Sequence, residues 1–275
     1  MIRYSCHSEN FLSPSPEEAF SFISALQFDC IDVASRSLIP QRMIAADPLK
    51  EACRFRDLSC RYHLPLSELF LSQVEVGGQP VSALSPMAHT KEFDSAFDII
   101  CLFAEKAGFA SIMGGTGAMK PELGYERSFE SMARTLKSQV SIAASHGLSF
   151  HVEPYRLSLL HTVWACLNMI QAVPGLRYTL DFLHFQFQGI PQAESMKLIP
   201  WAGHIHARQA KTGIGKCDFS EGEIDYESIV QELKRNNWSG DIAMEFWCSE
   251  ELSQAGIQAV EQNILMRYHL KRLFR

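Results

Sequence analysis

Residues 202–247 read AGHIHARQAKTGIGKCDFSEGEIDYESIVQELKRNNWSGDIAMEFW, and this stretch decides the fold class. The runs AGHIHARQ (202–209) and GDIAMEFW (240–247) are typical of buried β-strands. Between them, DYESIVQELKRNN (225–237) has apolar residues at helical spacing and begins with Asp225, a residue type that caps helices. Two strands separated by an amphipathic helix predict parallel strands joined by a crossover connection.

The same alternation of strand and helix recurs along the whole chain. Helix ends are recognisable: Ser15 precedes a helix that begins at Pro16, and Gly108 ends the helix predicted at 93–108. Eight strand–helix units in about 250 residues predict an α/β fold of the (β/α)8 TIM-barrel class, in a single domain over residues 1–275. The predicted strands cover residues 2–6, 28–35, 67–74, 109–115, 148–155, 177–182, 202–209 and 240–247. The predicted helices cover residues 15–26, 47–62, 93–108, 128–146, 160–172, 192–198, 225–237 and 250 to the end.

A doubly wound open sheet is the alternative architecture. It is disfavoured because no GxGxxG motif follows an early strand. The short glycine-rich segment GGTG (114–117) is interpreted as a flexible turn after a strand, although glycine there would also let the backbone approach a ligand closely.

Composition narrows the functional class. The chain has a formal net charge of −6, with 47% hydrophobic and 20% charged residues, which is globular composition and does not favour nucleic acid or anionic membranes. The basic tail MRYHLKRLFR (266–275) is interpreted as a solvated terminal helix. The N-terminal residues contain no apolar signal-peptide core, and no run of 18 apolar residues exists. Eight scattered cysteines without a CxxC pair indicate reduced thiols, so we predict a cytoplasmic protein.

Four consecutive predicted strands end in a residue that can ligate a metal. In a barrel of this class the chemistry lies at the carboxyl ends of the strands. The strand ends carry Glu153 in HVEPY, Asp181 and then His184 in LDFLH, His206 in HIHARQ, and Glu245 in MEFW. Three carboxylates buried together would repel one another strongly without a cation. A divalent ion (Mn²⁺, Mg²⁺, Co²⁺ or Zn²⁺) removes that repulsion, and neutral imidazole adds a nitrogen ligand. We therefore predict one divalent metal ion, held by Glu153, Asp181, His206 and Glu245.

His204, His206 and Arg208 alternate along the seventh strand and so share one face of it. We expect His206 to lie near the barrel mouth and His204 one layer deeper, in a packing and hydrogen-bonding role. Arg208 is expected just beyond the mouth. It is interpreted either as a surface salt bridge, or as a clamp on substrate oxygens that also balances the net −1 charge of a metal with three carboxylates. His7, just past the first strand, is a further candidate substrate contact.

Together these motifs resemble the xylose isomerase-like TIM-barrel superfamily, the sugar phosphate isomerase/epimerase group. The resemblance covers most of the chain. Its motifs are the opening unit at 15–35, Glu153, DxxH at 181–184, HxH at 204–206, and the stretch 222–246 that includes Glu245. It implies the same four metal ligands and substrate contact by His184. It also implies that Glu153 and Glu245 act as an acid/base pair, which carries a metal-bound keto sugar through a cis-enediolate to an epimer or to the aldose–ketose isomer.

The chain departs from the ketose 3-epimerases of that group at two positions. Those enzymes have a second substrate-contacting Glu where this chain has Leu159, and an Arg where it has Thr212. Arg208 and Lys211 are candidates to replace that contact. The substrate therefore stays open beyond a small carbohydrate-like molecule.

Three other functions share this barrel. One is a metal-dependent dehydratase (lyase) acting on an inosose- or dehydroshikimate-like keto-cyclitol, which stays open because Arg208 lies where many members of the family have a Lys after HxH. A non-catalytic sugar-binding barrel is less favoured because all four ligands are present. Endonuclease IV-like DNA repair is disfavoured because SELFLSQV and SIMGGTGAM lack the histidines that a multi-metal cluster needs. We expect no nucleic-acid or membrane partner, and a homo-oligomer is possible within this group.

Overall fold

The computed structural model describes residues 2–11, 15–117, 122, 124–248, 250, 254 and 256–275. Within these residues, eight parallel strands form a closed barrel, as the sequence predicts. Around the barrel the strands are ordered β1 (Ile2–His7), β10 (Gly240–Met244), β9 (Ala202–Ala207), β8 (Arg177–Asp181), β7 (Ser149–Val152), β6 (Ser111–Gly114), β3 (Leu66–Leu71) and β2 (Cys30–Ala34).

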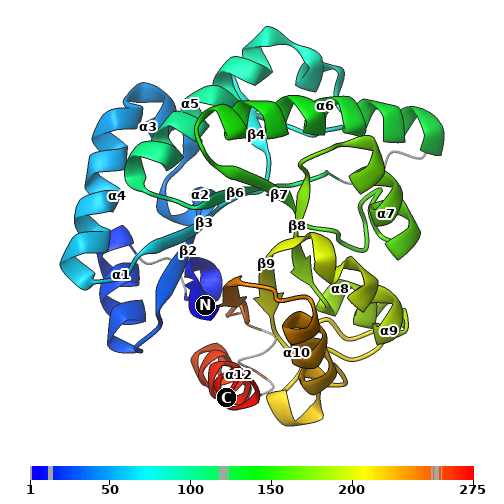
Figure 1. The fold of residues 1–275 in the computed structure, drawn as a ribbon. Coiled ribbons are helices and arrows are strands. Elements are labelled where there is room, and N and C mark those ends of the chain that lie inside the picture. The colour runs from blue at the N-terminus through cyan, green and yellow to red at the C-terminus, as the bar shows by residue number, and fades with distance from the viewer. Residues whose placement is uncertain are drawn as a thin grey trace.

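Helices surround this barrel (Figure 1). The longer ones are α1 (Pro16–Ala25), α4 (Pro48–Tyr62), α5 (Lys91–Ala107), α6 (Tyr125–Ser145), α7 (Val163–Ala172), α10 (Tyr226–Arg235) and α12 (Ala259–Leu273). Short α-helices are α2 (Ser35–Leu38), α3 (Gln41–Ala46), α8 (Leu183–Phe187) and α9 (Gln192–Ser195), and the 3₁₀ turns are η1 (Ser8–Asn10), η2 (Pro86–His89), η4 (Met196–Trp201) and η5 (Phe219–Glu221). No helix in the described ranges is long and apolar enough to cross a membrane.

The predicted helix ends form as their chemistry requires. Ser15 and Glu18 make a reciprocal capping box at the start of α1, each side chain accepting from the backbone N–H of the other. The side chain of Asp225 accepts two backbone N–H groups at the start of α10. Gly108 ends α5 with φ of 97°, a conformation that glycine adopts without a Cβ clash.

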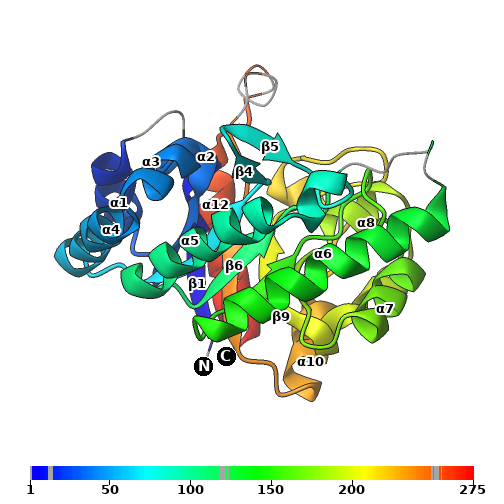
Figure 2. The same cartoon turned by 90° about the horizontal axis from the view of Figure 1, so that it is seen from above.

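The third strand differs from the prediction. It ends at Leu71, and the chain continues into an antiparallel hairpin of β4 (Val74–Val76) and β5 (Gln79–Val81). The Gly77–Gly78 turn has positive φ at both residues. The Gln41 side chain fixes the hairpin by donating to the carbonyl of Gln73 and accepting from the backbone of Glu75. Figure 2 shows the hairpin at the end of the barrel opposite the two chain termini.

The helix predicted at 192–198 is α9 followed by η4, and α2, α3 and α8 were not predicted. Three other helices differ from the prediction at their ends. The helix expected at 128–146 begins at Tyr125, and the one expected at 160–172 begins at Val163 behind the cap Thr162. The helix α12 begins at Ala259. The start expected near residue 250 lies in a stretch that the structure describes only in part.

Candidate metal and catalytic site

The four predicted ligands lie together at the carboxyl ends of adjacent strands. Glu153 directly follows β7, Asp181 ends β8, His206 lies in β9, and Glu245 directly follows β10. One ligand atom from each lies within 4.8 Å of the others. His206 Nδ1 is the centre of the group, 3.1 Å from Glu153 Oε1 and 2.9 Å from Glu245 Oε2. Three carboxylates and one imidazole therefore converge on one point, which we call the outer cluster.

Arg208 belongs to the outer cluster rather than to the surface. Its side chain is only 6% exposed. Its Nε and Nη2 donate to Asp181 Oδ2 at 2.9 and 2.6 Å, and Nη2 lies 3.2 Å from Glu245 Oε2. The Tyr226 hydroxyl holds the Arg208 backbone by accepting from its N–H and donating to its carbonyl, both at 2.9 Å. The interpretation as a surface salt bridge is wrong, because the side chain is buried and pairs with two buried carboxylates.

The charges of the outer cluster are arranged as ion pairs. Burial by itself would raise the pKa of Glu245, but Arg208 and His206 lower this pKa to about 2. Burial would also raise the pKa of Glu153, yet hydrogen bonds from His184 and His206 bring it well below its usual value. For His206 burial lowers the pKa, and the charge of Glu245 together with neighbouring hydrogen bonds raises it well above the usual value. Protons and a guanidinium thus balance the carboxylates.

This donor set fits a divalent metal ion. Within the described part of the chain, Glu245 Oε2 is buried and accepts no hydrogen bond of good geometry, although it lies close to two cationic groups. An unsatisfied buried carboxylate oxygen costs free energy, which coordination to an ion would recover. Three carboxylates and one nitrogen suit a hard or borderline divalent ion. An ion would take the place of the proton on His206 Nδ1, because only the deprotonated nitrogen can ligate.

A cavity of about 1050 Å³ opens above the outer cluster. Glu153, Glu245 and Arg208 line it, so the cluster faces the open space directly. His184 also lines it, with Nε2 3.8 Å from Glu153 Oε1 and 3.9 Å from Asp181 Oδ2, while its Nδ1 is buried without a hydrogen bond. The volume is slightly above the range typical of small-molecule pockets. The cavity is also lined by Arg36, Phe70, Tyr155, Arg156, Lys216 and Trp247.

A family model for the xylose isomerase-like TIM barrel matches residues 20–267 of this sequence. The chain belongs to the xylose isomerase-like TIM-barrel family. A solved structure with a similar fold is D-allulose 3-epimerase from Methylomonas sp. in complex with D-allulose, with 16% identity, TM-score 0.75, and 98% of this chain covering 96% of that one.

Two further solved structures are similar over nearly their whole length. The 3-keto-D-glucoside 4-epimerase YcjR from E. coli has 13% identity and TM-score 0.71, with 96% of this chain covering 99% of that one. The probable 3-DHS dehydratase AsbF from Bacillus anthracis has 16% identity and TM-score 0.68, with coverage of 96% and 98%. At these identities the likeness shows the fold alone. A search of curated protein sequences found no match.

The two positions where the chain departs from the ketose 3-epimerases of this family lie away from the cavity. Leu159 is fully buried in the apolar core. Thr212 contacts Glu223 through its backbone N–H. Lys211, a candidate replacement, pairs with Glu221 at 2.7 Å instead. None of these three is among the described residues that line the cavity.

His7 lies behind the cavity wall. It is fully buried, its ring centroid is 5.0 Å from that of Phe70 and 6.1 Å from that of Trp247, and its Nδ1 accepts from the backbone of Glu9. Its Nε2 has no hydrogen-bond partner in the described structure. His7 does not line the cavity as far as the described residues define it, and its contact with a substrate stays a prediction.

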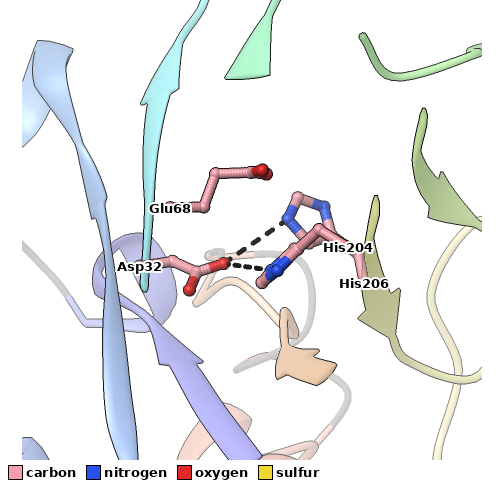
Figure 3. Close-up of side chains that lie close together, drawn as sticks. All are labelled: Asp32, Glu68, His204 and His206. Atoms are coloured by element: carbon pink, nitrogen blue, oxygen red, sulfur yellow. Dashed lines mark hydrogen bonds and ion pairs between the residues drawn. The ribbon is translucent and has the colours of Figure 1, made fainter. Parts of the chain in front are cut away.

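Two carboxylates near the site were not expected from the sequence. Asp32 in β2 and Glu68 in β3 point into the barrel beside His204 and His206 (Figure 3). Both are fully buried. The sequence signal that could have identified them is a carboxylate inside an otherwise apolar strand, which occurs in FDCIDVAS and in SELFL. A carboxylate in such a strand needs a buried partner.

Proposed function

We propose that this protein is a divalent-metal-dependent sugar isomerase or epimerase that acts through a cis-enediolate. The observation that carries the proposal is the pair Glu153 and Glu245. Both carboxylates line one cavity, and both lie within 3.1 Å of the same nitrogen of His206. A reaction that removes a proton from one carbon and returns it elsewhere needs two such groups beside one bound substrate. Epimerases on the same fold support this choice.

Each residue of the outer cluster then has a role. The ion, when bound, supplies Lewis-acid polarisation of a substrate carbonyl, which acidifies the neighbouring C–H group. Glu153 and Glu245 have lowered pKa values, so either is ionised at neutral pH and able to accept that proton. If the same glutamate returns this proton to the adjacent carbon, aldose and ketose are interconverted. If the other glutamate takes a proton from water and delivers it to the opposite face, the epimer is formed. His184 is placed at the cavity wall to hydrogen-bond a substrate hydroxyl.

The second candidate is a dehydratase of an acidic keto-cyclitol. Its first step is the same proton removal, followed by loss of a hydroxyl group as water. Besides Arg208, the cavity is lined by Arg36, Arg156 and Lys216, against the carboxylates of Glu153 and Glu245. Arg36 is already paired with Glu9, so the guanidinium of Arg156 is the additional group that favours a substrate with a carboxylate. The similar fold of a probable 3-DHS dehydratase supports keeping this candidate.

The experiment that tests the proposal combines metal analysis with proton NMR in D₂O. The purified protein is loaded with Mn²⁺ or Mg²⁺ and mixed with a panel of ketoses, aldoses and keto-cyclitols, with and without a carboxylate. Replacement of the C–H proton beside a carbonyl by deuterium is the expected result, with one ion bound per chain. A new sugar identifies an isomerase or epimerase, and an unsaturated product identifies the dehydratase. No bound ion and no exchange on any compound would contradict both.

Two variants test the glutamate pair. Glu153→Gln and Glu245→Gln should each lower the exchange rate by about 10²–10⁴-fold, since each removes one proton-transfer group. Glu51→Gln is the matched control, because Glu51 is a buried glutamate in α4 that pairs with Arg54 away from the cavity. If either site variant exchanged protons at the wild-type rate, the two-glutamate mechanism would be wrong.

A further inference from the structure

A second cluster lies one layer deeper in the barrel. Asp32 from β2, Glu68 from β3 and His204 from β9 gather around His206, with ligand atoms within 4.8 Å of one another (Figure 3). All four residues are at most 2% exposed. His206 is the one residue that this inner cluster shares with the outer cluster. The question is whether the inner cluster is a second ion site or a support for the first.

The oxygens of the inner cluster already have hydrogen-bond partners. Asp32 Oδ1 accepts from Ser5 Oγ at 2.5 Å, and Asp32 Oδ2 bonds His204 Nε2 at 2.7 Å. Glu68 is held by three side chains, His151, Ser111 and Thr179. An ion here would have to displace these bonds, each of which satisfies a buried carboxylate. The contacts therefore describe a closed hydrogen-bonded frame rather than a second ion site.

His206 is the exception within this frame. Its Nδ1 faces the outer cluster, while its Nε2 is buried and has no hydrogen-bond partner in the described structure. Within the described residues, the carboxylate oxygen that faces Nε2 is Asp32 Oδ2, at 3.8 Å. Asp32 cannot turn away, because Ser5 and His204 fix its two oxygens. One imidazole thus has its two nitrogens directed at two different sets of carboxylates.

We propose that Asp32 is a positioning residue that accepts a hydrogen bond from His206 Nε2–H when Nδ1 holds the ion. This inference rests on the proposed metal site. A ligating histidine must be neutral, so its single ring proton lies on the nitrogen that does not ligate. An acceptor at Nε2 fixes that tautomer and aims the Nδ1 lone pair at the cavity. Loss of such an outer partner commonly weakens metal binding by about 10- to 100-fold.

The test measures Zn²⁺ affinity by competition with a chelating indicator. Asp32→Ala removes the acceptor and should weaken Zn²⁺ binding by about 10- to 100-fold. Asp32→Asn keeps an oxygen acceptor without the charge, so its loss should be smaller. Glu68→Gln is the matched control, since Glu68 is equally buried in the same layer but bonds to His151, Ser111 and Thr179 rather than to His206. Its Zn²⁺ affinity should stay near that of the wild type, even if the fold is less stable.

A spectroscopic readout separates positioning from simple loss of stability. In the Zn²⁺-loaded wild type, the ring N–H proton of His206 should exchange slowly with water and correlate with Nε2 in a ¹⁵N spectrum, assigned by comparison with His206→Gln. In Asp32→Ala this signal should broaden or disappear, and in Glu68→Gln it should persist.

The possible outcomes are distinct. Wild-type affinity and an unchanged Nε2–H signal in a folded Asp32→Ala would overturn the inference. If Asp32→Ala does not fold, Asp32→Asn takes its place: because it keeps an acceptor but loses the charge, a Zn²⁺ affinity equal to that of the wild type would overturn the inference. Absence of Zn²⁺ and Mn²⁺ binding by the wild type would instead reject the proposed metal site, and the inference with it.

Discussion

Replacing Arg208 with methionine should destabilise the metal-free protein more than the metal-loaded protein. The guanidinium makes two hydrogen bonds to Asp181 and lies 3.2 Å from Glu245, with only 6% of the side chain exposed. Removing one partner of a buried ion pair costs about 3–5 kcal/mol, because the remaining charge is left uncompensated. We therefore expect the free energy of unfolding of metal-free Arg208→Met to fall by about 3–5 kcal/mol.

A bound divalent ion would neutralise the same two carboxylates. An ion at about 100 times its Kd stabilises a folded protein by about 2.7 kcal/mol. The variant lacks a positive charge beside the ion, so its Kd for Mn²⁺ should be lower than that of the wild type. Bound Mn²⁺ should therefore raise its free energy of unfolding by more. The difference in unfolding free energy between wild type and Arg208→Met should accordingly shrink when Mn²⁺ replaces EDTA.

Urea unfolding in EDTA and in excess Mn²⁺ measures this difference, with Arg3→Met as the control. Arg3 also bonds an aspartate, Asp241, through two nitrogens, but at the amino end of the barrel. Its half-exposed pair should cost less to break, and Mn²⁺ should leave that cost unchanged. If the cost of Arg208→Met were equally insensitive to Mn²⁺, Arg208 and the ion would not share carboxylates, and our account of charge balance would fail.

Two further predictions concern the fold. Gly203→Ala would place a Cβ 2.2 Å from the buried Nε2 of His151, so urea unfolding should show a loss of at least about 1–3 kcal/mol; wild-type stability would mean that the imidazole can move. Burial tends to lower the pKa of His146, but hydrogen bonds with Asp98 and Glu105 raise it overall. Its stabilising effect is therefore complete below the unfolded pKa of about 6.5 and lost as pH rises through the folded pKa. The cost of His146→Ala in unfolding free energy should be larger at about pH 5.5 than at about pH 8.5, and a cost independent of pH would exclude this ion pair as its origin.

The barrel could be predicted because its strands and helices carry repeated local signals. Apolar runs, caps such as Asp225, and the stop at Gly108 each act within a few residues. The β4–β5 hairpin was missed although Gly77–Gly78 is a turn signal, because its strands have only three residues each and show no clear alternation. The side chain that fixes this hairpin, Gln41, lies more than 30 residues away in the sequence.

The site was predictable at the strand ends and not below them. Glu153 and Glu245 directly follow a strand, so the carboxyl-end rule for barrels was enough to bring them together. Asp32 and Glu68 lie within their strands. Which layer an inward-pointing residue occupies depends on the stagger between neighbouring strands, which the sequence of a single chain does not specify. The surface interpretation of Arg208 failed for a similar reason, since its partners Asp181 and Glu245 come from neighbouring strands.

The two histidines of HIHARQ differ in what surrounds them, and this difference separates their roles. His204 Nε2 has a carboxylate partner in Asp32, and the carboxylates around it are satisfied within the protein. His206, two residues further along β9, has one nitrogen at the outer cluster and another without a partner. A strand repeats its facing direction every two residues, so one strand places a histidine in each layer. In our proposal the inner histidine therefore has a structural role through Nε2, whereas the outer one binds the ion through Nδ1 and donates Nε2–H to Asp32.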